Sequence, residues 1–130
     1  MNISLTVKNF FGMIPGPNRG KYHGKIHSKL NQSIVDIYKV YDSLFNINGV
    51  VEAVLTESLR DPETFEWETR ENPGFVSASN DPLELDALVT TLLGTNPLSV
   101  EYLKLAAETF GPWSEASLKG NQDSGISIFA

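Results

Sequence analysis

The sequence contains no cysteine among its 130 residues. This absence excludes a disulfide framework, a zinc–thiolate site and a cysteine nucleophile. No apolar run reaches the roughly 18 residues that a membrane-spanning helix needs, so we expect no membrane partner. The first residues, MNISLTVK, alternate apolar and polar side chains and lack the continuous apolar stretch of a secretory signal. We therefore expect a cytoplasmic protein.

Acidic residues are missing from residues 1–29, which carry five lysine and arginine side chains. Residues 52–86 show the opposite imbalance, with ten acids and two arginines, and the whole chain has a net charge of −6. Affinity for nucleic acid comes largely from neutralising phosphates, so we expect no nucleic-acid partner. An acidic surface instead suits a basic protein partner, which it attracts and orients.

The composition is typical of one globular domain that spans residues 1–130. Hydrophobic residues make up 41% of the sequence and charged residues 20%. A chain of this length can bury one core without a disulfide or a metal to hold it together. No motif points to a cofactor, and we predict none.

Three segments are predicted to be helical. The clearest runs from Ile26 to Phe45, where apolar residues recur at steps of three and four and so fall on one face of a helix. Ser28 and Ser33 are both candidate N-caps for this helix. Asp81 precedes a second helix as its N-cap, with Pro82 at the first helical position. Asn96-Pro97 repeats the same device before a third helix, which ends at Phe110.

Alternating or β-branched apolar residues predict the strands. The predicted segments are residues 3–8, 19–29, 50–56, 65–70 and 75–79, with a last short strand near residues 126–129. The segment 50–56 also suits a helix. Asn72-Pro73-Gly74 predicts a turn that joins residues 65–70 and 75–79 as a hairpin. The resulting fold class is α+β, with three helices packed on a mainly antiparallel sheet of about four to six strands.

Few side chains suggest chemistry. The glycine-rich stretch from Gly16 to Lys21 lacks the spacing and the hydroxyl residue of a phosphate-binding loop. His23 and His27 would lie about 13 Å apart on a strand, too far to share a metal, and we interpret them as part of a solvated basic face. Their alternative role is acid–base chemistry beside the neighbouring lysines. We nominate no catalytic residue and no metal site.

Four apolar residues, Phe10, Phe11, Met13 and Ile14, stand in a loop rich in glycine and proline. We expect them to anchor this loop under the core. The alternative is an exposed patch for a partner or for self-assembly.

In size, acidity, lack of cysteine and lack of a catalytic motif, the chain resembles bacterial immunity proteins of contact-dependent toxin systems. The resemblance implies a protein that neutralises a nuclease-like toxin domain by covering its active site. The partner would then be basic and would contact the acidic segment and its aromatic residues, with Trp67 or Phe75 as an apolar anchor. The predicted contact residues are Asp61, Glu63, Glu66, Trp67, Glu68, Glu71 and Phe75.

Three alternative functions remain open from the sequence. They are a phage-type inhibitor of a host protein, a self-assembling structural subunit, and an enzyme that uses His23 or His27 on a phosphorylated substrate. The inhibitor hypothesis also depends on the place of the basic residues 19–29. If they fold against the acidic segment 52–86, the two charges cancel and the attraction for a basic partner is lost.

Overall fold

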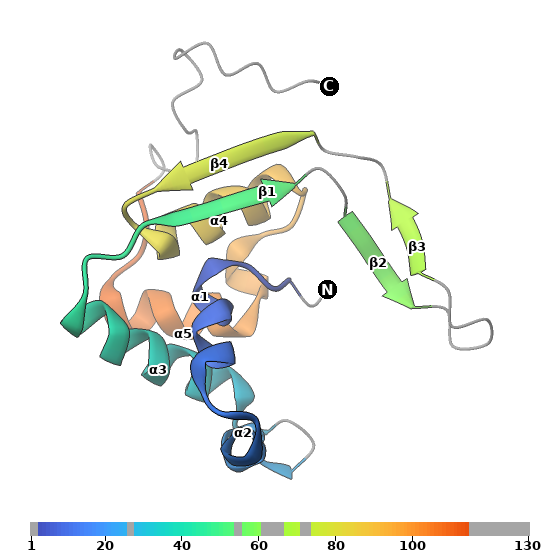
Figure 1. The fold of residues 1–130 in the computed structure, drawn as a ribbon. Coiled ribbons are helices and arrows are strands. Elements are labelled where there is room, and N and C mark those ends of the chain that lie inside the picture. The colour runs from blue at the N-terminus through green and yellow to red at the C-terminus, as the bar shows by residue number, and fades with distance from the viewer. Residues whose placement is uncertain (1–2, 26–27, 54–55, 61–66, 71–73, 115–130) are drawn as a thin grey trace.

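The structure is a computed structural model that describes residues 3–25, 28–53, 56–60, 67–70 and 74–114. These residues form five α-helices, four strands and two short 3-10 helices (Figure 1). The helices are α1 (Thr6–Asn9), α2 (Gly16–His23), α3 (Leu30–Leu44), α4 (Pro82–Leu92) and α5 (Glu101–Phe110), with η1 (Phe10–Met13) and η3 (Pro97–Ser99). The strands are β1 (Gly49–Ala53), β2 (Thr56–Arg60), β3 (Trp67–Arg70) and β4 (Phe75–Ser79).

The predicted sheet of about four to six strands packed with three helices is wrong. The described strands form two separate two-stranded antiparallel sheets, β1·β4 and β2·β3, so the fold is mainly helical with a minor sheet. The predicted hairpin between residues 65–70 and 75–79 is also wrong, because β3 pairs with β2 and β4 pairs with β1. Ala53 pairs with Phe75, and Thr56 pairs with Arg70. The β2·β3 pair therefore follows the β1·β4 pair along the same two segments of the chain.

The two strands predicted in the N-terminal quarter are helices instead. Residues 6–13 form α1 and η1, and the first part of the basic segment, residues 19–23, belongs to α2. The reason for α1 is a long-range contact, since the amides of Thr6 and Val7 donate to the carboxylate of Asp86 in α4. These bonds satisfy amides at the start of a helix, where no carbonyl of the same helix can accept them.

The predicted helix over residues 26–45 is confirmed in its main part as α3. The predicted N-caps Ser28 and Ser33 are wrong, because Lys29 is the N-cap residue and makes no side-chain cap. Ser33 lies inside the helix, where its hydroxyl donates to the carbonyl of Tyr22 at 2.9 Å. Ile34, Val35 and Tyr38 are buried. The predicted apolar face extends too far, since Leu44 is 67% exposed and Phe45 58% exposed.

The predicted start of α4 is confirmed in detail. The side chain of Asp81 accepts hydrogen bonds from the amides of Leu83 at 2.9 Å and Glu84 at 3.0 Å. Asn96 makes the same kind of bond to Leu98, but it caps η3, and α5 begins only after Val100. The strand predicted near residues 126–129 lies outside the described residues.

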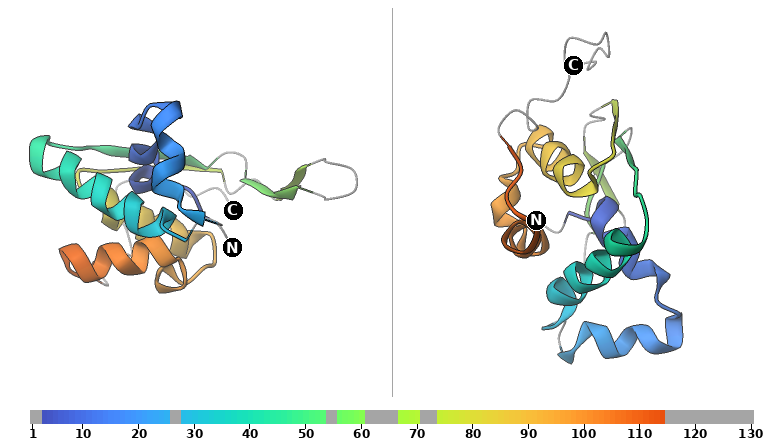
Figure 2. Two further views of the ribbon diagram at one scale, coloured as in Figure 1. Left: turned by 90° about the horizontal axis from the view of Figure 1, so that it is seen from below. Right: turned by 90° about the vertical axis from the view of Figure 1, so that its left-hand side faces the viewer.

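The core consists of two clusters that share α4. The larger cluster joins α1, η1, α3 and α5, and the smaller one lies between α4 and the β1·β4 sheet. Figure 2 shows α4 between that sheet and α5. Gly49 allows β1 to approach the helices, because a Cβ at this position would lie 2.8 Å from a methyl carbon of Leu85 and 3.2 Å from one of Thr6. In the described part of the chain, no helix is long and apolar enough to cross a membrane.

Candidate functional site

The pair of strands β2 and β3 forms an arm that projects from the helical body (Figures 1 and 2). Among the described residues, these strands pack on each other and have no extensive contact with a helix. At the root of the arm, the amide of Gly74 donates to the carbonyl of Ala53 at 3.0 Å and continues the β1·β4 ribbon. The sequence of residues 56–71, which includes both strands, contains six acids and two arginines. Of these acids, the structure describes Glu57 in β2 and Glu68 in β3, so both belong to strands that are set apart from the core.

The predicted contact residues do not all share this arm. Trp67 and Glu68 lie in β3. Phe75 is the first residue of β4, and its side chain is buried against Val51 and Leu85 in the smaller core cluster. In this conformation Phe75 contributes to the core at the root of the arm and does not form a surface anchor. The remaining predicted contact residues lie outside the described residues; they are Asp61, Glu63, Glu66 and Glu71.

The basic segment packs against the helical body. Its helix, α2, contacts α3 through the bond from Ser33 to Tyr22, and the ring of His23 meets the ring of Phe11 edge-on with their centres 5.0 Å apart. The Arg19 guanidinium donates to the carbonyls of Gly12 at 2.9 Å and Ile14 at 3.0 Å. The views in Figures 1 and 2 place α2 and the arm on different parts of the molecule. The described part of the basic segment therefore does not cover the acidic arm.

The apolar residues of the N-terminal loop mostly serve the core, as expected. Phe11 is buried, and the Phe10 ring packs on those of Tyr38 and Tyr41 with centres 5.6 and 5.2 Å apart. Met13 is 64% exposed and stands apart from this packing.

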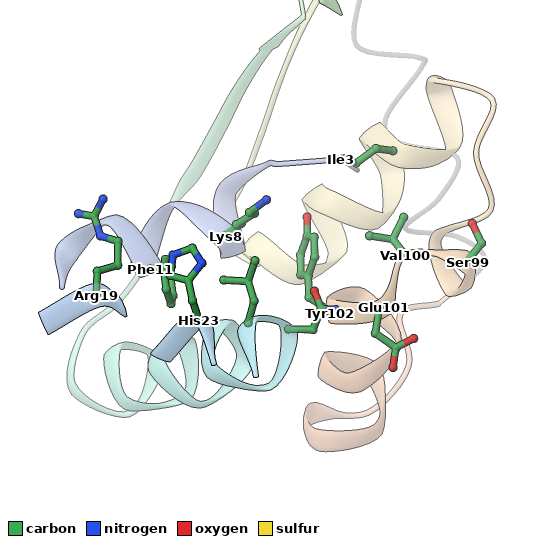
Figure 3. Close-up of a pocket in the computed structure, with 11 residues that line it drawn as sticks. Ile3, Lys8, Phe11, Arg19, His23, Ser99, Val100, Glu101 and Tyr102 are labelled. Atoms are coloured by element: carbon green, nitrogen blue, oxygen red, sulfur yellow. The ribbon is translucent and has the colours of Figure 1, made fainter. Parts of the chain in front are cut away.

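A cleft of about 710 Å³ separates the α1–α2 side of the body from the η3–α5 side (Figure 3). Lys8, Arg19 and His23 lie on the first side, and Ser99 and Glu101 on the second. The lining residues are Ile3, Lys8, Phe11, Arg19, His23, Leu30, Asn31, Ser99, Val100, Glu101 and Tyr102. Sequence reasoning singled out His23 but not the cleft, because its two sides come from segments far apart in the chain. His27 lies outside the described residues.

Asp86 fixes the wall of this cleft from inside the protein. Its buried carboxylate accepts from the amides of Thr6 and Val7, each at 2.9 Å, and from the hydroxyl of Thr6. The hydroxyl of Tyr102 lies 3.4 Å away, and its ring lines the cleft. Burial raises the pKa of Asp86 to about 6, while these hydrogen bonds act in the opposite direction. Asp86 thus caps α1, and the sequence gives no local sign of it because its partners are about eighty residues away.

Among the residues that the structure describes, no three histidine, aspartate or glutamate side chains gather closely enough to hold a metal ion. The geometry of this part of the chain therefore offers two candidate surfaces, the acidic arm and the mixed-charge cleft.

Residues 1–91 match a family model described as "Domain of unknown function (DUF362)". This match covers more than half of the chain. The chain belongs to the DUF362 family. No curated protein and no solved structure is significantly similar to it.

The DUF362 match includes the arm and nearly all of α4, whereas η3 and α5 follow it in the sequence. One side of the cleft is therefore made by the matched residues and the other by residues outside the match. The arm lies entirely within the matched part.

Proposed function

We propose that this protein is a small acidic inhibitor of the immunity type, which docks through its arm onto a basic, nuclease-like toxin domain. One observation carries the proposal: strands β2 and β3, which come from the most acidic part of the sequence, form a two-stranded arm that projects away from the helical body. A core segment would not need this separation. A segment that enters the active site of another protein must project from the body in this way.

Charge supplies the physical reason. A nuclease must present cationic groups to the phosphates of its substrate. Carboxylates on a partner protein attract such groups, speed the encounter and fix the orientation of the complex. Because α2 packs on α3, the part of the basic segment that lies in α2 does not cover the arm.

The arm also contains an aromatic residue suited to an interface. Tryptophan is enriched among the residues that contribute most to binding energy. We assign Trp67 this role, with the carboxylates around it as the charged contacts. These acids are Asp61, Glu63, Glu66, Glu68 and Glu71.

The test is capture of the partner from the native producer by tagged protein, at low and at moderate salt, with mass spectrometry as the readout. Three forms are compared: the wild type, the variant Glu66→Lys/Glu68→Lys and the matched control Asp36→Lys/Glu108→Lys. The control makes the same change of charge at exposed positions of α3 and α5. We expect the wild type and the control to retain a basic toxin domain and the arm variant to lose it, with a loss of at least about tenfold for two reversed charges.

The captured domain is then produced alone, and its nuclease activity is titrated with the protein. An inhibitor that covers the active site abolishes activity at a one-to-one ratio. Capture that is equal in all three forms, or a captured partner whose activity is unchanged, would contradict the proposal.

A further inference from the structure

The cleft has a charge layout that the inhibitor function does not use. Lys8 and His23 stand on its α1–α2 side, and Glu101 stands at the beginning of α5 on the other (Figure 3). Within the described residues, neither Lys8 nor Arg19 forms an ion pair with an acid. One side of the cleft therefore carries positive charge that no described acid neutralises.

Apolar and aromatic side chains form about half of the cleft lining. Phe11 and Val100 are buried, and Leu30 is half-buried against the same core cluster. Tyr102 and Asn31 add polar atoms to this surface. A volume of about 710 Å³ is in the usual range for a site that takes a small molecule, and such sites combine apolar walls with a few polar groups.

Hydrogen bonds and a ring contact hold the wall that carries Lys8 in place. Asp86 binds the amides of the two residues that precede Lys8, and Arg19 in α2 donates to the carbonyls of Gly12 and Ile14. The ring of His23 is held edge-on against Phe11. A binding site with a fixed wall loses little freedom when the ligand enters.

We propose that this cleft binds a small organic anion, with its carboxylate or phosphate group beside Lys8 and His23 and its apolar body over Phe11 and Val100. Glu101 sets the orientation, because it repels a negative group from the η3–α5 side. The site is separate from the arm, so it is a second binding site of the protein and does not depend on the inhibitor function.

Backbone amide NMR spectra of the full chain test this site. The protein is titrated with phenyl phosphate, with benzoate and with the neutral benzyl alcohol. We expect at least one anion to shift the amide signals of Lys8, His23 and Val100, with all three shifts following one saturating binding curve. Benzyl alcohol should bind at least about fivefold more weakly, because it lacks the charge that one ionic contact near water requires. The stronger of the two anions shows whether the site takes a phosphate or a carboxylate.

Two pairs of variants examine the charges separately. Lys8→Met should weaken binding of the anion about fivefold, while Lys39→Met, an exposed change on α3, should alter it less than about twofold. Glu101→Gln should strengthen binding about twofold, and Glu108→Gln on the exposed side of α5 should have no effect. The spectrum of each variant also reports whether it is folded.

Several results would overturn the proposal. They are the lack of a saturating shift with either anion, equal binding of benzyl alcohol, and equal losses in the two lysine variants. A weaker anion complex in Glu101→Gln would also contradict the assigned orientation.

Discussion

The arm and the helical body of this protein follow different physical rules. The body is organised around fully buried side chains, such as Leu103 and Val89, and around the buried carboxylate of Asp86. The arm has paired strands but no extensive contact with a helix among the described residues. Isolated two-stranded hairpins are at most marginally stable in water. We therefore expect the arm to add little to the stability of the fold.

This difference predicts that mutations in the two regions will affect different properties, stability in the body and partner binding in the arm. Changes in the body should alter the free energy of unfolding, whereas changes in the arm should alter association with a partner. The predictions below run from the largest effect on stability to the smallest.

Leu103→Ala should have the largest effect. Leu103 lies in α5 and is fully buried in the larger core cluster. Because removal of its methyl groups leaves a cavity, we expect a loss of roughly 2–5 kcal/mol in the free energy of unfolding. Leu98→Ala is the matched control, because Leu98 is 54% exposed, and it should change stability by less than about 1 kcal/mol. Urea unfolding measures both. Equal losses at the two positions would contradict the described core.

The pH dependence of stability should reveal Asp86. The carboxyl has a pKa of about 6 in the folded protein and an ordinary value of 3.8, so between these values the native state binds more protons than the unfolded state. Stability must then fall as the pH rises from about 4 to about 6, by roughly 3 kcal/mol at 1.36 kcal/mol per pKa unit. When protonated, the carboxyl can donate to the hydroxyl of Thr6, which can in turn donate to the carbonyl of Pro82.

Asp86→Asn removes this titrating group and should flatten the decline. Urea unfolding at several pH values compares the two proteins. A wild type whose stability rises over this interval, or an Asp86→Asn variant with the same slope, would show that Asp86 is not the responsible group.

Asp81→Ala should have an intermediate effect. The side chain caps α4 through the amides of Leu83 and Glu84, and loss of such a cap costs about 1 kcal/mol. Because α4 contributes residues to both core clusters, we expect the variant to unfold in a single cooperative transition with a lower midpoint temperature. Asp36→Ala, an exposed change within α3, is the control and should cost less. The midpoint of thermal unfolding provides the comparison.

Neutralising the arm should have the smallest effect on stability. We expect Glu57→Gln/Glu68→Gln to change the free energy of unfolding by less than about 0.5 kcal/mol, as for surface substitutions outside a packed network. The same variant should associate more slowly with the partner and with a weaker dependence on salt. A large loss of stability would mean that the arm is part of the core.

The sequence was informative where the structure depends on neighbouring residues. Asp81 and Pro82 define the start of α4 within one turn, and the spacing of Leu30, Ile34 and Tyr38 predicts α3. Both signals are local. The acids around Trp67 were predicted to contact a partner from their density in the sequence alone, and that role stays a prediction.

The missed features depend on contacts between distant residues. Ile3, Leu5 and Val7 alternate as in a strand, but the cap supplied by Asp86 turns the next residues into a helix. The turn predicted at Asn72-Pro73-Gly74 favoured pairing of residues 75–79 with β3. Instead β4 pairs with β1, because Phe75 and Val51 are buried together against α4, a contact that the local sequence does not reveal. The cleft was missed for the same reason, because Lys8 and Glu101 meet only in the folded chain.

The central claim is that the arm binds and the body folds without it. Its most direct test is a variant in which residues 54–74 are replaced by Asn-Gly. Ala53 and Phe75 are paired in the β1·β4 sheet, and a two-residue turn of this type joins such a pair with the twist that antiparallel strands require.

Urea unfolding of this variant is measured alongside capture of the partner by the same preparation. The account predicts a single cooperative transition, with a free energy of unfolding within about 1 kcal/mol of the wild type, and complete loss of capture. A variant that fails to fold, or one that folds and still captures the partner as the wild type does, would contradict it.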